Sequence, residues 1–248
     1  MNNKAWAVAK INLRTIGALY FATFTTVLGF VLSIGLGFFL YSGNVAPAGD
    51  IYDTVTTAGH ISPANALWLL PVMVAIALPA YNFKRIINLG GKRSGFFWGS
   101  LITYVILAGV AALLVTISNF AIEPLFERHP YFSSTFFGGI ANLVEVFGWA
   151  ERGAAVAFVQ QFAFFVLLTA FVHTLVAAQG RWYGWATNMA IVVIIAVFTP
   201  IAPLRAVLGR FLTLILLHPS AVVQVAACLV LAAGIYGLSK LALDRKTV

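Results

Sequence analysis

Tyr81–Ser100 reads YNFKRIINLGGKRSGFFWGS and concentrates positive charge, because it contains four cations: Lys84, Arg85, Lys92 and Arg93. Long apolar segments precede and follow it in the chain. About 20 apolar residues are enough for a helix to cross a bilayer, so both segments are candidate spans. The stretch therefore predicts a basic connection held between two membrane-spanning helices.

The composition of the whole chain is that of an integral membrane protein. Of its 248 residues, 61% are hydrophobic and only 9% are charged, whereas about a quarter of a typical soluble domain is charged. The length leaves room for about six spans and for no soluble domain. The net charge of +8 is spread beside the spans, where cations set orientation, which argues against a nucleic-acid partner. Cys228 is the single cysteine, so no disulfide can form within the chain.

We predict an all-α polytopic membrane protein whose 248 residues form one transmembrane domain. The six expected spans cover approximately residues 15–41, 64–80, 96–120, 153–178, 183–204 and 219–241. Residues 1–14 are expected to form an amphipathic interfacial helix, and 81–95 a cytoplasmic coupling region with a short helix. Residues 136–150 and 205–218 are expected to be outer-surface or re-entrant helices that precede spans 4 and 6.

The distribution of charge predicts the orientation. With both termini in the cytoplasm, most of the 15 lysines and arginines lie inside, namely Lys4, Lys10, Arg14, Lys84, Arg85, Lys92, Arg93, Arg181, Lys240, Arg245 and Lys246. All but one of the seven carboxylates lie outside, the exception being Asp244. This distribution obeys the positive-inside rule. In a bacterium it places the chain in the cytoplasmic membrane, as a multi-pass protein.

Two features near the N-terminus have open alternatives. Trp6, Ala9 and Leu13 recur at helical spacing, away from nearby cations, which is typical of an interfacial helix; the alternative is an ordinary basic flank of the first span. In that span, small residues recur every fourth position, at Gly29, Ser33 and Gly37. Such a stripe allows close helix packing, and the alternative is a stripe that lines a pore.

The spans contain few polar side chains. His173 lies in the fourth span, where it either bonds to a neighbouring helix or relays protons. Gln160 and Gln161 precede it in the same span, and they either bond across helices or line a cavity. Pro71 is expected to kink the second span. The pathway residues proposed from sequence are therefore Gln160, Gln161 and His173.

Several kinds of chemistry lack their usual residues. There is no GxxxxGK[ST] phosphate loop and no HExxH pair, and the histidines have no metal-ligand spacing. Membrane proteolysis and ion-coupled transport need ionisable groups at depth, and no Asp, Glu, Lys or Arg stands at the centre of an expected span. We expect no catalytic residue, metal or cofactor on this chain.

The basic stretch has an apolar component that charge anchoring does not explain. Phe83, Ile86 and Leu89 would give a short helix an apolar face, and Gly90-Gly91 would end that helix. Such a helix either lies along the lipid headgroups or fits a groove on a soluble protein. In the second case it transmits displacement into the two spans that flank it.

Leu78–Ser100 resembles the signature between the second and third spans of ABC-2-type transporter permeases, which are small bacterial six-span subunits without a nucleotide-binding domain. In that family a glycine, a basic pair, two phenylalanines and another glycine commonly introduce the third span. The matching residues are Gly90 or Gly91, Lys92-Arg93, Phe96-Phe97 and Gly99. This chain has a second glycine, and lysine stands where serine or threonine is frequent.

The resemblance implies the permease subunit of an ATP-driven exporter of peptides, antimicrobials or lipid-like compounds. Two ATPase subunits would bind ATP and Mg²⁺, and they would join two copies of the permease or one copy and a related permease. The coupling helix would contact the ATPase through Phe83, Lys84, Arg85, Ile86, Leu89, Gly90, Lys92 and Arg93. The alternatives from other classes are an ATP-independent channel or carrier and a non-transporting scaffold subunit.

Overall fold

The computed structural model describes residues 5–17, 67–122, 124, 143–179, 182–198 and 200–245, and all regular elements in these ranges are helices. Four of them are long and apolar enough to cross a membrane: Leu69–Asn88, Arg93–Ala121, Ala154–Ala178 and Ala221–Asp244. A fifth is added if Gly184–Phe198 and Ala202–Leu217 count as one broken span. The membrane character and the all-helical class are confirmed for the described residues. The first expected span, with Gly29, Ser33 and Gly37, lies outside them apart from its first three residues.

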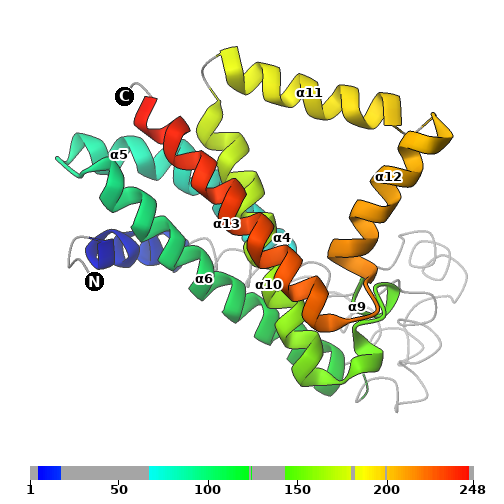
Figure 1. Cartoon of the computed structure of the whole chain (residues 1–248). Helices are drawn as coiled ribbons and strands as arrows, with labels where there is room; N and C mark the ends of the chain where they lie inside the picture. Colours follow the sequence, from blue (N-terminus) through cyan, green and yellow to red (C-terminus); the bar gives the residue numbers. More distant parts are fainter. Residues whose placement is uncertain are drawn as a thin grey trace, which may run out of the picture.

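The bundle is built around α10 (Ala154–Ala178), which packs most extensively against three other helices. Its neighbours are α4 (Leu69–Ala77), α6 (Arg93–Ile117) and α13 (Ala221–Arg245). The long helices α6, α10 and α13 run side by side in Figure 1, with α4 behind them. A helix that is apolar on all sides is suited to such a central position.

The second span and the expected coupling helix are one element rather than two. α4, the π-helical turn η1 (Leu78–Asn82) and α5 (Phe83–Asn88) form a continuous 20-residue helix. The helix therefore runs through the boundary expected at residue 80/81 without a break. Pro79 stands in η1, and a proline lacks the N–H that an α-helix would bond to the preceding turn. A π turn absorbs this defect locally without ending the helix.

The kink expected at Pro71 is absent. Pro71 is the third residue of α4, which begins at Leu69. The first four N–H groups of a helix have no partner within the helix, so a proline costs little at this position. The proline that changes the helix geometry is Pro79, which lies about two turns further along.

A tight turn joins α5 to α6. Gly90 has a φ of +80°, and the Gly91 N–H donates to the Ile86 carbonyl at 2.9 Å. A Cβ on Gly91 would lie 2.5 Å from the Ile86 Cγ2 atom, so this position also requires glycine. The helix end predicted at Gly90-Gly91 is confirmed. α6 begins at Arg93, three residues before the expected start of the third span.

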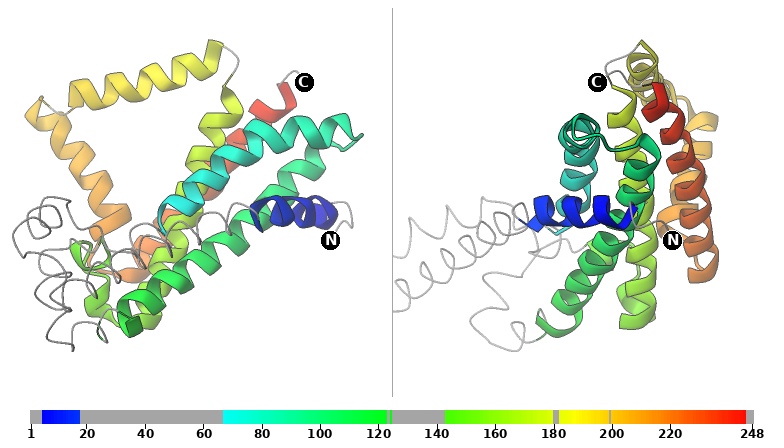
Figure 2. Two further views of the ribbon diagram at one scale, coloured as in Figure 1. Left: turned by 180° about the vertical axis from the view of Figure 1, so that it is seen from behind. Right: turned by 90° about the vertical axis from the view of Figure 1, so that its left-hand side faces the viewer.

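Residues 5–17, here called the N-terminal helix, run across the bundle (Figure 2). The buried residues recur at helical spacing: Ala5, Val8, Ala9, Asn12 and Ile16. Two residues expected to share an apolar face differ in burial, since Ala9 is buried and Trp6 is 52% exposed; the interfacial position of this helix stays a prediction. Small side chains face the protein because the N-terminal helix approaches the backbone of α6 closely, and the larger Trp6 and the cations are left on the outside.

At the opposite end of the bundle, two short elements precede α10. They are α9 (Leu143–Val146) and the 3₁₀ turn η3 (Ala150–Arg152). Glu145 is exposed, as expected for a surface segment, while Trp149 is buried and donates its Nε1–H to the Leu216 carbonyl at 2.9 Å. The rest of the helix expected at 136–150 lies largely outside the described residues.

The fifth expected span ends earlier than predicted. α11 (Trp182–Phe198) is followed by a sharp corner and by α12 (Ala202–Leu212), which continues into the π turn η4 (Thr213–Leu217). The helix direction bends by 118° at this corner, and in Figure 1 the two helices extend away from the bundle before α12 returns to the start of α13. Residues 202–204 thus belong to the next helix. Pro203 stands in the first turn of α12, where a proline is favoured.

Candidate functional site

The basic stretch forms an exposed cationic face at one end of the bundle. On the helix that ends at Asn88, the exposed residues recur at helical spacing, namely Tyr81, Lys84, Arg85 and Asn88. Leu89 and Lys92 in the following turn are also exposed, Leu89 by 75%. We call these six residues the basic face, and the end of the bundle that carries it the basic end.

The apolar residues of this stretch point inward rather than toward a partner. Phe83 is fully buried and Ile86 is 4% exposed. The Phe83 ring packs edge-on against Phe96 of α6, with 5.2 Å between ring centroids. The apolar docking face expected from Phe83, Ile86 and Leu89 is therefore not present on the surface, because only Leu89 remains exposed. Two apolar side chains at the base of the turn stabilise its attachment to α6 instead.

Arg93 connects the turn to the end of α13. Its guanidinium donates to the Leu243 carbonyl at 3.0 Å and to the Asp244 carbonyl. The last carbonyls of a helix have no partner within the helix and carry partial negative charge, so a cation is favoured there. Arg93 therefore has a structural contact that Lys84, Arg85 and Lys92 do not show, and the C-terminal end of α13 lies beside the basic turn.

The N-terminal helix is also joined to this end of the bundle. The buried Asn82 side chain of η1 donates to the Asn12 side chain at 3.1 Å. On α6, a Cβ added to Gly99 would lie 2.7 Å from the Val8 Cβ and 3.0 Å from the Ala5 carbonyl oxygen. Gly99 is thus required by the close approach of the two helices. The basic turn contacts, directly or through one residue, the N-terminal helix, α6 and α13.

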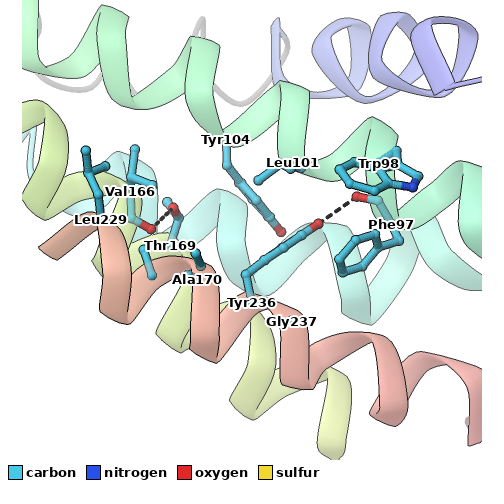
Figure 3. A pocket seen from close by; sticks show the side chains of 12 residues that line it. Phe97, Trp98, Leu101, Tyr104, Val166, Thr169, Ala170, Leu229, Tyr236 and Gly237 are labelled. Carbon is cyan, nitrogen blue, oxygen red and sulfur yellow. Dashed lines mark hydrogen bonds between the residues drawn. The ribbon is translucent and has the colours of Figure 1, made fainter. Parts of the chain in front are cut away.

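A buried polar cluster lies deeper in the bundle. The Tyr104 hydroxyl of α6 and the His173 Nδ1 atom of α10 are 2.7 Å apart, and the Tyr236 hydroxyl of α13 donates to the Phe97 carbonyl at 2.7 Å. The His173 ring centroid is 5.2 Å from that of Tyr236. Figure 3 shows Tyr104 and Tyr236 converging from α6 and α13. His173 therefore bonds to a neighbouring helix, the arrangement that its packing interpretation predicts.

The two glutamines of α10 are both fully buried but have different surroundings. The Gln160 amide donates to the Gln224 side chain of α13, and the Gln224 amide donates to the Ile215 carbonyl at 3.0 Å. Among the residues that the structure describes, neither amide atom of Gln161 has a hydrogen-bond partner. Gln160 links two helices, as the packing interpretation predicts. A pathway role for Gln160, Gln161 or His173 stays a prediction.

Sequence reasoning missed Tyr104 and Tyr236, although both were visible as phenols inside apolar segments. A buried tyrosine hydroxyl usually finds a hydrogen-bond partner, so a mid-span tyrosine signals a contact between helices. It also missed the cluster around Trp68, whose ring stacks on Trp149 with 5.9 Å between centroids. Which side chains meet in these two clusters depends on which helices are neighbours. The spacing of residues along the sequence does not indicate which helices are neighbours.

Within the described residues, no group of three or more His, Cys, Asp or Glu side chains could hold a metal ion. The described bundle thus offers packing, a cationic surface and hydrogen bonds between helices. Comparisons with protein-family models, with curated proteins and with solved structures found no match.

Proposed function

We propose that this chain is the transmembrane permease subunit of an ATP-driven exporter in the bacterial cytoplasmic membrane. A separate ATPase subunit would bind ATP and Mg²⁺, and it would dock on the basic face. The working complex would contain two ATPase copies and two permeases, identical or related. The cargo would be an amphipathic compound such as a peptide, an antimicrobial or a lipid-like molecule.

The observation that carries the proposal is the rigid connection between the basic face and the long helices. Four of the six residues of the basic face lie on a helix that is continuous for 20 residues from Leu69 to Asn88, and the other two lie in the turn that follows it. Phe83 in this helix packs on Phe96 of α6, whose ring centroid is 6.4 Å from that of His173 in α10. Arg93 adds a connection to α13. A force applied at the turn would thus reach four helices of the bundle.

The basic face also suggests the chemistry of its partner. Its cations Lys84, Arg85 and Lys92 are exposed, and its uncharged members are Tyr81, Asn88 and Leu89. Electrostatic complementarity favours an acidic groove on the ATPase. Tyrosine is enriched in the centres of protein interfaces, so Tyr81, which is 75% exposed, would be the principal anchor in place of Phe83 and Ile86.

The proposal is tested by purifying the chain from its native membrane and measuring how much ATPase accompanies it. In the triple variant Lys84→Glu, Arg85→Glu and Lys92→Glu, we expect the amount of associated ATPase to fall about tenfold or more, because like charges then face the acidic groove. Arg93 is left unchanged because it stabilises the fold. The matched control reverses three exposed cations elsewhere, with Lys10→Glu, Arg205→Glu and Arg210→Glu.

Two results would contradict the proposal. The first is a wild-type chain that purifies without any ATPase. The second is an equal loss of ATPase in the basic-face variant and in the control. If the purified chain alone passed a solute across liposomes without nucleotide, an ATP-independent channel or carrier would replace the exporter. If the activity of the associated partner did not change with any solute, the chain would instead be a non-transporting scaffold subunit.

A further inference from the structure

An apolar cleft of about 370 Å³ opens in the side of the bundle between α6 and α13 (Figure 3). Trp98 and Leu101 of α6 form one wall, and Leu229 and Gly237 of α13 form the other, while α10 contributes the floor through residues that include Thr169. Binding sites for small molecules usually have volumes of about 300–1,000 Å³. The cleft is therefore large enough for part of a ligand.

The side-chain hydroxyl groups of Thr169, Tyr236 and Tyr104 at the cleft are already bonded within the protein. The Thr169 hydroxyl donates to the Phe165 carbonyl at 2.9 Å, the Tyr236 hydroxyl donates to the Phe97 carbonyl, and the Tyr104 hydroxyl bonds with His173. The bond from Tyr236 to the Phe97 carbonyl also joins α6 and α13 at the basic end of the cleft. A molecule in the cleft therefore contacts mainly hydrocarbon groups of the wall. The cleft thus favours an apolar ligand over a polar one.

The dimensions of the cleft suit a lipid acyl chain. Leu229 and Gly237 are eight residues apart in α13, which is about 12 Å at the helical rise of 1.5 Å per residue. Gly237 in turn lies eight residues before Arg245, the last residue of α13. The cleft is therefore about 12 Å from the basic end, within the leaflet that faces that end, because the hydrocarbon core is about 30 Å thick.

A cation stands where the headgroup of such a lipid would lie. Lys240 is exposed and follows Gly237 by three residues and Tyr236 by four, so it lies on the same face of α13, one turn closer to the basic end. Trp98 is 54% exposed on the opposite wall, and tryptophan favours the region between hydrocarbon and headgroups. An apolar cleft that ends beside a lysine is complementary to an anionic amphiphile.

We propose that this cleft holds one acyl chain of an anionic phospholipid whose phosphate lies beside Lys240. The lipid comes from the leaflet that faces the basic end. The proposal does not depend on ATP-driven export, because it concerns binding alone, and a chain that fails to bind an ATPase would still retain the lipid.

The experiment measures retained lipid by native mass spectrometry on the purified full chain. The chain is offered an equal mixture of phosphatidylglycerol and phosphatidylcholine with the same acyl chains. Gly237→Phe fills the cleft, whereas Gly234→Phe is the matched control, because a Cβ at either glycine meets nothing within 4 Å and Gly234 does not line the cleft. We expect Gly237→Phe to lower lipid retention about tenfold, since excluding only two methylene groups has that effect.

The charge is tested in the same mixture. We expect the wild type to retain phosphatidylglycerol about fivefold more than phosphatidylcholine, because one lysine near the surface contributes that much attraction to an anionic lipid. Lys240→Gln should remove this preference, and Lys10→Gln on the N-terminal helix should preserve it. Thermal unfolding of each variant shows that the chains compared are folded.

Three results would overturn the proposal. Equal retention in Gly237→Phe and Gly234→Phe would show that the lipid binds elsewhere. Equal retention of the two phospholipids by the wild type would exclude an anionic occupant. If Gly237→Phe dissociated a dimer and left lipid retention unchanged, the occupant of the cleft would be a second copy of the chain.

Discussion

Replacing Gly99 by alanine should displace the N-terminal helix from α6. The Cβ of the new residue would lie 2.7 Å from both the Cβ and the Cγ1 of Val8, and 3.0 Å from the Ala5 carbonyl oxygen. Carbon atoms in favourable contact are about 3.5–4.0 Å apart, so the two helices must separate by about 1 Å. No rotamer of Val8 relieves the clash, because its Cβ is fixed by the backbone.

The expected cost follows from two opposing effects. Forcing an extra methyl group into a well-packed contact costs about 1–3 kcal/mol. Alanine in place of glycine within a helix contributes about 0.5–1 kcal/mol of stability. Gly109→Ala is the matched control on the same helix, because its Cβ would meet only a Phe162 ring atom at 4.0 Å. We therefore expect Gly99→Ala to be about 2 kcal/mol less stable than Gly109→Ala, or ~4–8 °C lower in Tm.

The assay combines thermal unfolding in detergent with hydrogen exchange of the amides in residues 5–17. Gly99→Ala should lower the protection of these amides, whereas Gly109→Ala should not. Val8→Ala should restore stability only in part, since it leaves the Val8 Cβ in place, and Val8→Gly should restore more. Equal melting temperatures for the two glycine variants, with unchanged exchange in residues 5–17, would refute the close contact between the N-terminal helix and α6.

Two further predictions concern hydrogen bonds between helices. Tyr236→Phe removes the bond to the Phe97 carbonyl and should lower the free energy of unfolding by about 1 kcal/mol. Tyr81→Phe on the exposed basic face should leave the unfolding temperature unchanged. Equal effects of the two variants on the unfolding temperature would contradict the buried bond. Arg93→Gln removes the contacts with the end of α13 and should increase hydrogen exchange at the last turn of that helix, whereas Lys92→Gln should not. Equal exchange in these two variants would show that Arg93 does not stabilise α13.

The glycines of the basic stretch have separate physical roles. Gly90 has a positive φ, and Gly91 approaches the Ile86 side chain closely. Gly99 allows the N-terminal helix to cross α6. Two of these three positions, Gly91 and Gly99, are required by space rather than by backbone conformation. The resemblance identified Gly90 or Gly91 and Gly99 together as one pattern, and the structure explains each position by a different contact.

Sequence reasoning was most successful for long apolar segments. The helices Arg93–Ala121, Ala154–Ala178 and Ala221–Asp244 lie within a few residues of the expected spans. Hydrocarbon thickness and the need to satisfy backbone hydrogen bonds impose these lengths on any sequence. The end of the helix at Gly90 was predicted for a similar reason, because it depends on local backbone conformation alone.

Sequence reasoning failed where a helix has two candidate faces. Phe83 and Ile86 were expected on a docking surface, and both are buried. The periodicity identifies which residues share a face, but it does not say whether lipid, a partner or the same chain covers that face. In a membrane protein this ambiguity is greater, because lipid is as apolar as the protein interior.

The sequence by itself determined the helical class, the approximate positions of the described spans and the concentration of cations at one connection, since each of these depends on local composition. Only the tertiary structure decided that Phe83 and Ile86 are buried, that Arg93 holds the end of α13, and that Tyr104, His173 and Tyr236 meet. The physical reason is that these contacts join residues far apart in the chain, so they exist only after the helices have packed. Where α6 and α13 pack on α10, they leave the cleft beside Lys240.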